Sequence, residues 1–337
     1  MTNTNPPASS EHPFAPYVRI LGKGKSGSRS LSQTEARDAL GMILRGEVEP
    51  LQVGAFLMLL RVKEETGEEL AGFVQACRDN LVAPTAAIQA DLDWSSYAGK
   101  KHQHPWFLLS ILLLTDAGYR IFVHGSAGHT QGRLYTENAM RELGLPVADS
   151  WGTVQQQLDT EGFSYLSLGY FCAGLEELMQ LRPLLGLRSP VNTLARLINP
   201  LACEASVQSV FHPAYAALHQ QADQLLGQPT ALVFKGESGE VEIKPHADTQ
   251  LIRLHEGHSQ EIPLTRTQMH RAASVNAPAV APLRALWQDE AADPYGIEAT
   301  LATAAAALLV LKPELDVAAA RAEAAALWNK RNPERLN

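Results

Sequence analysis

Cysteine is scarce in this chain of 337 residues, which has only Cys77, Cys172 and Cys203. Three is an odd number and the spacing matches no metal-ligand motif, so neither a disulfide framework nor a zinc knuckle organises the fold. We expect three buried thiols in a reducing compartment. The 24 glycines and 20 prolines are too few for a collagen-like or low-complexity chain.

Long apolar runs are also missing. The longest, Trp106 to Leu114 and Leu301 to Leu311, each contain one hydroxyl residue and are well short of the roughly 20 residues that cross a bilayer. Residues 1–16 are polar and proline-rich and lack the apolar core of a signal peptide, so we expect a flexible N-terminus. The sequence therefore predicts a soluble, cytoplasmic protein that does not contact membranes.

An excess of positive charge is the third absence. The chain has 28 Lys and Arg residues against 36 Asp and Glu residues, for a formal net charge of -8. The whole-molecule charge therefore does not attract nucleic acid or an anionic membrane. Any basic site must be local.

The first structured region reads as helices. Ser32 and Glu35 form a capping-box pattern, and apolar residues at helical spacing continue it, which predicts a helix from about 32 to 45. A second helix begins after Pro50 and is apolar on nearly all sides, so we expect it to be buried among others. A third runs from about 68 to 80. These helices predict a small all-helical domain over residues 17–83.

The remaining sequence alternates helices with short apolar strands, which is typical of an α/β domain with a mostly parallel sheet. We assign this larger domain to residues 84–173 and 204–337. The predicted strands are 119–123, 163–168, 230–234 and 240–243. The predicted helices are 106–117, 135–143, 214–226, 298–310 and 315–328, and residues 174–200 are also helical.

Four stretches carry a family resemblance: SLSQTEARDALGMILRGEVEPLQVGAFLMLLRVKEETGEELAGF from residue 30, VHG at 123–125, LRPLLGLRSPVNTLARLINP at 181–200, and FKGESGEVE at 234–242. They resemble the anthranilate phosphoribosyltransferases and nucleoside phosphorylases of glycosyltransferase family 3. GKGKSGSRSL, YAGKKHQHPW and TLARL are more similar to the YbiB-type branch, which the resemblance marks as DNA-binding. The resemblance implies a phosphoribosyltransferase-like fold, helices from about 174–203 that join the small domain, and a homodimer through that domain.

The chain departs from the family at its phosphate loop. In the enzymes a GTGGD loop lets backbone N–H groups surround pyrophosphate, and a Cβ would obstruct that approach. The matching segment here is SYAGK, with one glycine and with Lys100 in place of the acid. The family's polar NIST segment corresponds to residues 106–109, which are Trp, Phe, Leu and Leu.

The other catalytic motifs are altered as well. The family's KHGNR segment corresponds to residues 123–127 here, without either cation. The family's Asp-Glu metal pair falls on Val241 and Glu242, and a single carboxylate is a poor magnesium site. The resemblance therefore implies no catalytic residue, no resident metal and no cofactor, with magnesium expected only if the chain is a divergent transferase.

Lysine and arginine nevertheless gather in particular loops. Five of the nine lysines fall in loops that the family fold places around the cleft between its two domains, and residues 17–34 and 178–203 contain no acid. Such donor-rich loops favour phosphate contacts over base edges. The sequence therefore predicts sequence-tolerant nucleic-acid binding. The residues we expect to contact phosphates are Lys23, Lys25, Arg29, Lys100, Lys101, Arg133, Arg188, Arg196 and Lys235.

Three alternatives stay open. Arg182 matches the family arginine that binds the anthranilate carboxylate, so it could hold a small carboxylate ligand, or its stem could simply cover apolar surface. The scattered cations could only balance helix ends and neighbouring acids. The chain could also be a divergent phosphoribosyltransferase in which Lys100 and Arg196 clamp pyrophosphate.

Overall fold

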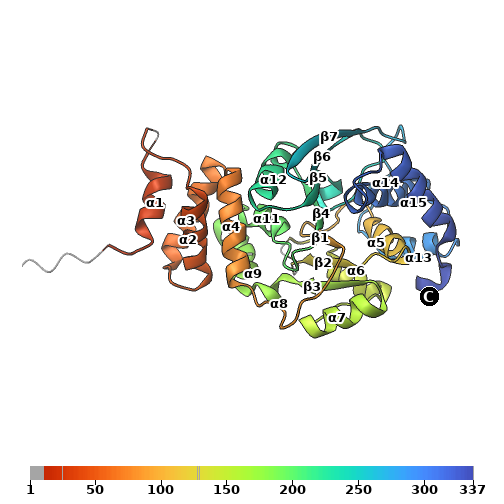
Figure 1. The fold of residues 1–337 in the computed structure, drawn as a ribbon, viewed down its shortest axis with the longest axis horizontal. Helices are drawn as coiled ribbons and strands as arrows, with labels where there is room; N and C mark the ends of the chain where they lie inside the picture. The colour runs from red at the N-terminus through yellow and green to blue at the C-terminus, as the bar shows by residue number, and fades with distance from the viewer. Residues whose placement is uncertain (1–10, 25, 127, 129, 337) are drawn as a thin grey trace, which may run out of the picture.

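A computed structural model describes residues 11–24, 26–126, 128 and 130–336. The molecule is elongated, with a helical domain at one end and a larger α/β domain at the other (Figure 1). The long helix α4 lies between the two and contacts both.

Local sequence signals start the helices of the small domain. Side chains and backbone of Ser32 and Glu35 form the predicted capping box, and Thr66 and Glu69 form a second one. These helices are α1 (Ala15–Gly22), α2 (Gln33–Leu44), α3 (Pro50–Lys63) and α4 (Gly67–Asn80).

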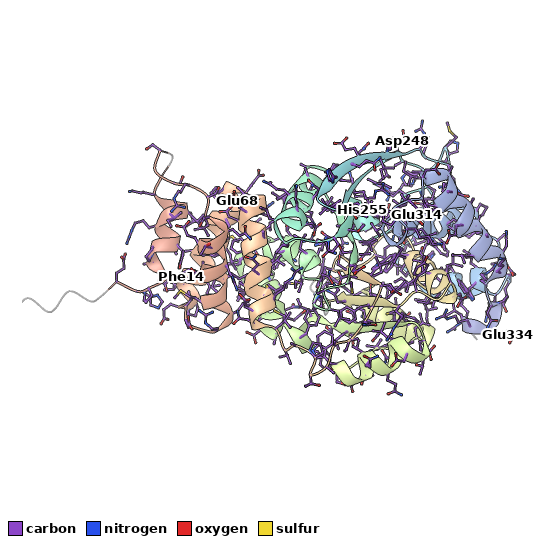
Figure 2. The ribbon with its side chains drawn as sticks, viewed as in Figure 1. Phe14, Glu68, Asp248, His255, Glu314 and Glu334 are labelled. Atoms are coloured by element: carbon purple, nitrogen blue, oxygen red, sulfur yellow. The ribbon has the colours of Figure 1, made fainter. Side chains whose placement is uncertain are left out.

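Two expectations for this domain are wrong. Residues 1–10 lie outside the described part of the chain, but Phe14, labelled on the small domain in Figure 2, is buried within the stretch expected to be flexible. Its ring packs against Phe56, with the ring centroids 5.3 Å apart. Helix α3 is not buried on all sides. Leu51 and Val62 are 89% and 83% exposed, so part of the apolar surface of α3 is exposed to solvent in a single chain.

A seven-stranded sheet forms the centre of the larger domain. Its order is β3-β2-β1-β4-β5-β6-β7; neighbours from β3 to β5 pair in parallel, and β6 and β7 add an antiparallel hairpin. The predicted mostly parallel sheet is confirmed, but residues 240–243 are not a strand. The strands are β1 (Leu92–Ser96), β2 (Ile121–Gly125), β3 (Phe163–Ser167), β4 (Ala205–Val210), β5 (Thr230–Lys235), β6 (Thr249–His255) and β7 (His258–Leu264).

Helices cover both faces of the sheet. One face packs against α5 (Phe107–Asp116), α6 (Thr136–Leu143), α13 (Ala281–Trp287), α14 (Pro294–Leu311) and α15 (Val317–Lys330). The other packs against α7 (Trp151–Thr160), α8 (Leu168–Phe171), α9 (Ala173–Gln180), α11 (Val191–Leu194) and α12 (Ala214–Leu225). Helix α14 is long and apolar enough to cross a membrane, yet 72% of it is buried inside the fold, as in a core helix.

The segment after β3 ties the two domains together. It contains α9, α10 (Arg182–Leu185), α11 and the short helix η1 (Ala195–Leu197), and it shares an apolar cluster with α4. The Arg78 guanidinium of α4 donates to the carbonyl oxygens of Ile198 and Leu197 at 2.7 and 3.3 Å. This packing holds the 188–197 loop opposite the carboxyl ends of the strands.

Candidate functional site

The candidate site lies where the carboxyl ends of the parallel strands meet the small domain, the usual place for ligands in open α/β sheets. Strand β1 runs into the turn Tyr97–Lys100, and β5 runs into the turn 235–242. A Cβ on Gly236 would lie 1.7 Å from the Glu240 carbonyl oxygen, so only glycine permits the tight second turn. That turn brings Glu240 back against the β1 turn.

The Glu240 carboxylate is buried and accepts three hydrogen bonds. The backbone N–H groups of Ala98 and Gly99 donate to one oxygen at 2.7 and 2.5 Å, and the Ser96 hydroxyl donates to the other at 2.6 Å. Consecutive N–H groups aimed at one point form an anion-binding nest. We call these three donors the cradle. The acceptor in this cradle is the chain's own carboxylate.

A second buried carboxylate lies two residues further on. Glu242 accepts a hydrogen bond from the Lys100 ammonium at 2.5 Å and one from the Phe107 N–H at 3.0 Å, at the N-terminus of α5. Burial raises the pKa of Glu242 to about 7, and Lys100 and the Phe107 N–H oppose that rise. The lysine and the helix N-terminus therefore both interact with a carboxylate of the chain itself.

This geometry corrects the expectation for Lys100. Its backbone pairs with Leu134 in an antiparallel bridge, and its side chain is 1% exposed in the ion pair with Glu242. Lys100 therefore cannot contact a phosphate on the surface, either of nucleic acid or of a clamped pyrophosphate.

The residues present do not fit a magnesium–pyrophosphate group. Val241, at the position of the family's metal-binding Asp, is buried in the main apolar core, and Glu242 is already held by Lys100. The described residues contain no cluster of three or more His, Cys, Asp or Glu side chains that could hold a metal ion. The cradle N–H groups already have an acceptor in Glu240.

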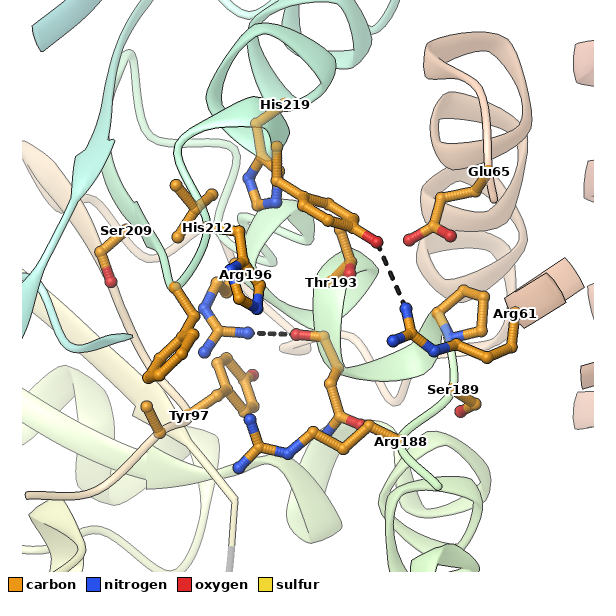
Figure 3. A pocket seen from close by; sticks show the side chains of 16 residues that line it. Arg61, Glu65, Tyr97, Arg188, Ser189, Thr193, Arg196, Ser209, His212 and His219 are labelled. Carbon is orange, nitrogen blue, oxygen red and sulfur yellow. Dashed lines mark hydrogen bonds between the residues drawn. The ribbon is translucent and has the colours of Figure 1, made fainter. Parts of the chain in front are cut away.

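Next to the cradle is an open pocket of about 140 Å³ between the small domain and the sheet edge. Arg61 of α3, Arg188 of the loop after α10 and Arg196 of η1 enter it from three sides (Figure 3). Arg61 donates to the Tyr215 hydroxyl at 3.4 Å, and Arg196 donates to the Asn192 carbonyl. Arg188 has no hydrogen-bond partner among the described residues.

Five arginines in and beside this pocket form what we call the arginine cleft: Arg61, Arg133, Arg182, Arg188 and Arg196. Burial lowers the pKa of Arg188, and the repulsion from the charges of Arg133 and Arg182 lowers it further. None of the five forms a salt bridge with any residue that the structure describes. Glu65, which lines the pocket, interacts with Arg61, and the buried Glu240 interacts with Arg196, whereas the charges that act on Arg188 include those of Arg133 and Arg182 and no carboxylate of a described residue.

Comparison with known proteins places this architecture. Residues 16–81 match the helical bundle domain of the glycosyl transferase family, and residues 108–330 match its α/β domain. The chain belongs to glycosyltransferase family 3. Within the family it is anthranilate phosphoribosyltransferase-like, as its relatives show.

One family-3 relative is the Escherichia coli protein YbiB, 30% identical over 242 residues, which cover 71% of this chain and 75% of YbiB. Another is the anthranilate phosphoribosyltransferase of Geobacillus kaustophilus, 26% identical over 239 residues, covering 71% and 70%. Among solved structures, the Thermus thermophilus enzyme superposes with a TM-score of 0.76 at 23% identity, covering 93% and 97% of the two chains. The Saccharomyces cerevisiae enzyme, solved with PRPP and Mg, gives 0.76 at 18%, covering 96% and 95%. These structures share the fold.

The predicted phosphate-contacting residues divide into groups. Arg133, Arg188 and Arg196 come together in the arginine cleft, as does Arg182, whose guanidinium also donates to the Thr130 hydroxyl at 2.7 Å. The exposed Lys101 and Lys235 follow the strand ends at the same edge of this family-3 sheet.

The remaining predicted cations are not at the cleft. Lys23 follows α1, at the end of the small domain far from the sheet (Figure 1), and Arg29 pairs with Glu35 through two hydrogen bonds of 2.6 and 2.7 Å. The expectation that these two surround the cleft is wrong for a single chain, because the α1–α2 connection belongs to the small domain alone. Lys25 lies outside the described residues.

Several residues at this edge were not predicted from the sequence. Phe211 lines the pocket and is 49% exposed, and Lys244 is close enough to Lys235 and to Arg271 for their charges to interact. The alternating segment 205–210 is strand β4, and recognising it would have put Phe211 at a strand end. Arg61 was missed because α3 was expected to be buried.

Proposed function

We propose that this family-3 protein binds nucleic acid through the arginine cleft. The observation that carries the proposal is Arg188, which is half-buried beside Arg133 and Arg182 and has no acidic partner among the described residues. Like charges held together without a counterion raise the electrostatic free energy, and a chain of phosphates lowers it. A polyanion is the ligand whose charge matches this cluster.

The rim of the cleft supports a ligand longer than a single phosphate. Lys101, Lys235 and Lys244 add positive charge along the strand ends, where Arg271 is paired with Glu237. Phe211 offers an exposed ring for stacking with an unpaired base. No recognition helix or zinc finger is present among the described residues, so contacts go to the sugar-phosphate backbone. Binding is therefore expected to tolerate sequence changes.

Fluorescence anisotropy with labelled single- and double-stranded oligonucleotides between about 50 and 200 mM salt tests this proposal. The double variant Arg182→Gln, Arg188→Gln should weaken binding at least tenfold and reduce the log–log salt slope by roughly 0.7 to 0.9 for each phosphate that the variant no longer neutralises. The matched control is Arg37→Gln, an exposed arginine on α2 paired with Asp79. Equal affinity and slope in parent and double variant would refute the proposal.

Phosphoribosyl transfer is a second candidate, because several relatives named anthranilate phosphoribosyltransferase are 23% to 28% identical to this chain. The closed cradle and the absence of a second carboxylate at Val241 weigh against it. Calorimetry with phosphoribosyl pyrophosphate and magnesium separates the two candidates. Tight binding that requires the metal supports transfer, whereas heat from oligonucleotide alone supports nucleic-acid binding.

We also propose a homodimer through the small domain. Leu51 on α3 is exposed beside Ala15, Val18 and Ala55, which together line a shallow apolar surface on α1 and α3. A second copy that covers this surface would remove it from water. Light scattering on the parent and on Leu51→Glu tests this. A parent that is monomeric at tens of micromolar would contradict the proposal.

A further inference from the structure

We propose that Glu240 is a built-in anion that keeps the cradle closed, and that removing its carboxylate opens a site for inorganic phosphate or pyrophosphate. The proposal concerns the cradle alone and does not depend on nucleic-acid binding at the arginine cleft. It assigns Glu240 the role of an internal competitor for phosphoryl groups.

The donors of a phosphate site are present in the cradle. Two consecutive backbone N–H groups and one hydroxyl converge on the Glu240 carboxylate at 2.5 to 2.7 Å. Gly99 has a φ of 68°, the left-handed conformation that turns successive N–H groups toward one point. The Ser96 hydroxyl is fixed by a 2.5 Å hydrogen bond to the Thr136 hydroxyl. These donors are therefore oriented by the fold as well as by the carboxylate.

The turn that carries Glu240 is anchored independently of its carboxylate. The Ser209 hydroxyl donates to the Gly239 carbonyl at 2.6 Å, and Arg133 donates to the Ser238 carbonyl at 3.4 Å. Because both ends of the interaction belong to one folded chain, the carboxylate is present at a high effective concentration, and a free anion must compete against it. The fold thus excludes phosphate without losing the donors.

The following residues complete the closure. Val241 packs into the apolar core, and the Glu242 carboxylate accepts a hydrogen bond from the backbone N–H at the start of α5. The N-terminus of a helix also favours anions, so it is the second anion-binding position at the carboxyl ends of these strands. One three-residue segment therefore supplies an internal carboxylate to each position. Lys100 balances only the second of these charges, so the loss of Glu240 leaves the first position without an anion.

Nearby charge favours an incoming oxyanion once Glu240 is removed. Arg196 lies close enough to Glu240 for the two charges to interact, and the Arg133 guanidinium donates to the carbonyl oxygens of Ala98 and Gly99 at 3.0 and 2.8 Å. A phosphate in the vacated cradle would accept from the N–H groups and face both guanidinium groups. Removing the carboxylate also leaves those buried N–H groups unsatisfied, which adds to the drive for a replacement anion.

The experiment compares Glu240→Ala and Glu240→Gln with the parent, using pyrophosphate without metal in titration calorimetry. The alanine variant should bind pyrophosphate at least tenfold more tightly than the parent. The glutamine variant should bind it no more tightly than the parent, because its side chain still fills the space. Glu237→Ala is the matched control, since Glu237 is a buried carboxylate of the same turn that does not contact the cradle N–H groups.

Backbone amide spectra locate the ligand. Pyrophosphate should shift the Ala98 and Gly99 amide resonances of the alanine variant more than those near Arg188, because the ligand accepts hydrogen bonds from these two N–H groups. A folded alanine variant with parental affinity for pyrophosphate would overturn the proposal, as would a parent that binds pyrophosphate as tightly as the variant. Binding that persists unchanged in all variants and disappears in Arg188→Gln would assign the ligand to the arginine cleft and also overturn it.

If Glu240→Ala is less stable than the parent, a thermal-shift measurement still tests the proposal. Pyrophosphate at 10 mM should then raise the melting temperature of the variant more than that of the parent, with sodium chloride of equal ionic strength as the reference, since a ligand that binds only the folded state stabilises it. No preferential rise would refute the proposal. Oligonucleotide affinity is a separate readout, and its outcome does not alter this one.

Discussion

The cradle and the arginine cleft lie side by side at one sheet edge and use their donors differently. In the cradle, the Ser96 hydroxyl and the N–H groups of Ala98 and Gly99 donate to a carboxylate of the chain itself, and the Lys100 ammonium beside it donates to another. In the cleft, Arg188 has no acceptor among the described residues. The difference is whether the chain supplies the anion. In the cradle a carboxylate of the chain fills the site, so the loop is part of the packed interior. At Arg188 the described residues supply no carboxylate, so the guanidinium group is available to a ligand.

This comparison predicts two separate sets of effects. Substitutions of Lys100 or Glu242, the buried ion pair beside the cradle, should change the free energy of unfolding and leave oligonucleotide affinity per folded molecule unchanged. Substitutions in the cleft should do the reverse. The largest change is expected at the buried ion pair beside the cradle, and the smallest at the rim of the cleft.

Lys100→Met should lower the free energy of unfolding at pH 8 by about 3 to 5 kcal/mol, because it leaves the buried Glu242 charge without its partner. Lys101→Met is the matched control: its side chain is exposed, and the change should stay within about 0.5 kcal/mol. Chemical denaturation of both variants measures the difference. Similar losses in the two variants would show that the pair does not stabilise the cradle.

The pH dependence of stability should also report on the cradle. The pKa of Glu242 is raised to about 7 by burial, so the folded protein retains a proton that the unfolded chain releases near pH 4.5. Its contribution to stability is therefore complete below about pH 4.5 and is lost as the pH rises through 7, by up to about 1.4 kcal/mol per pH unit. Denaturation of the parent and of Glu242→Gln at pH 5 and pH 8 should show a smaller loss of stability with rising pH in the variant. Parallel curves would contradict the assignment.

The architecture could be predicted from the sequence, but the difference between the closed cradle and the open arginine cleft could not. Capping residues such as Ser32 and the alternation of helices with apolar strands are local signals, so helices and a parallel sheet could be predicted. The Lys100–Glu242 pair joins residues 142 positions apart, and only the packed fold brings them together. Side-chain burial is likewise a tertiary property, so the sequence predicts the same role for Lys100 and Lys101 although one is buried and the other exposed.

Arg188→Gln should have the opposite effect to Lys100→Met: it should weaken oligonucleotide binding and leave the free energy of unfolding nearly unchanged. Its guanidinium has no salt bridge with a described residue and is repelled by Arg133 and Arg182. Removing the charge should change the free energy of unfolding by no more than about 0.5 kcal/mol. Oligonucleotide affinity at low salt should fall several-fold. A variant that unfolds much more easily would place Arg188 in the supporting structure and remove it from the proposed interface.

The smallest effect is expected at the rim. Lys235 is exposed at the end of β5, so Lys235→Gln should reduce the log–log salt slope by about 0.7 to 0.9 and leave stability unchanged, because one phosphate contact accounts for one step of counterion release. Lys312→Gln is the matched control, since that lysine pairs with Glu323 and does not follow a strand end at the site. Anisotropy titrations at four or more salt concentrations resolve a change of this size. Parental slopes in both variants would confine the interface to the arginine cleft, whereas a reduced slope in Lys235→Gln alone would extend it along the strand ends.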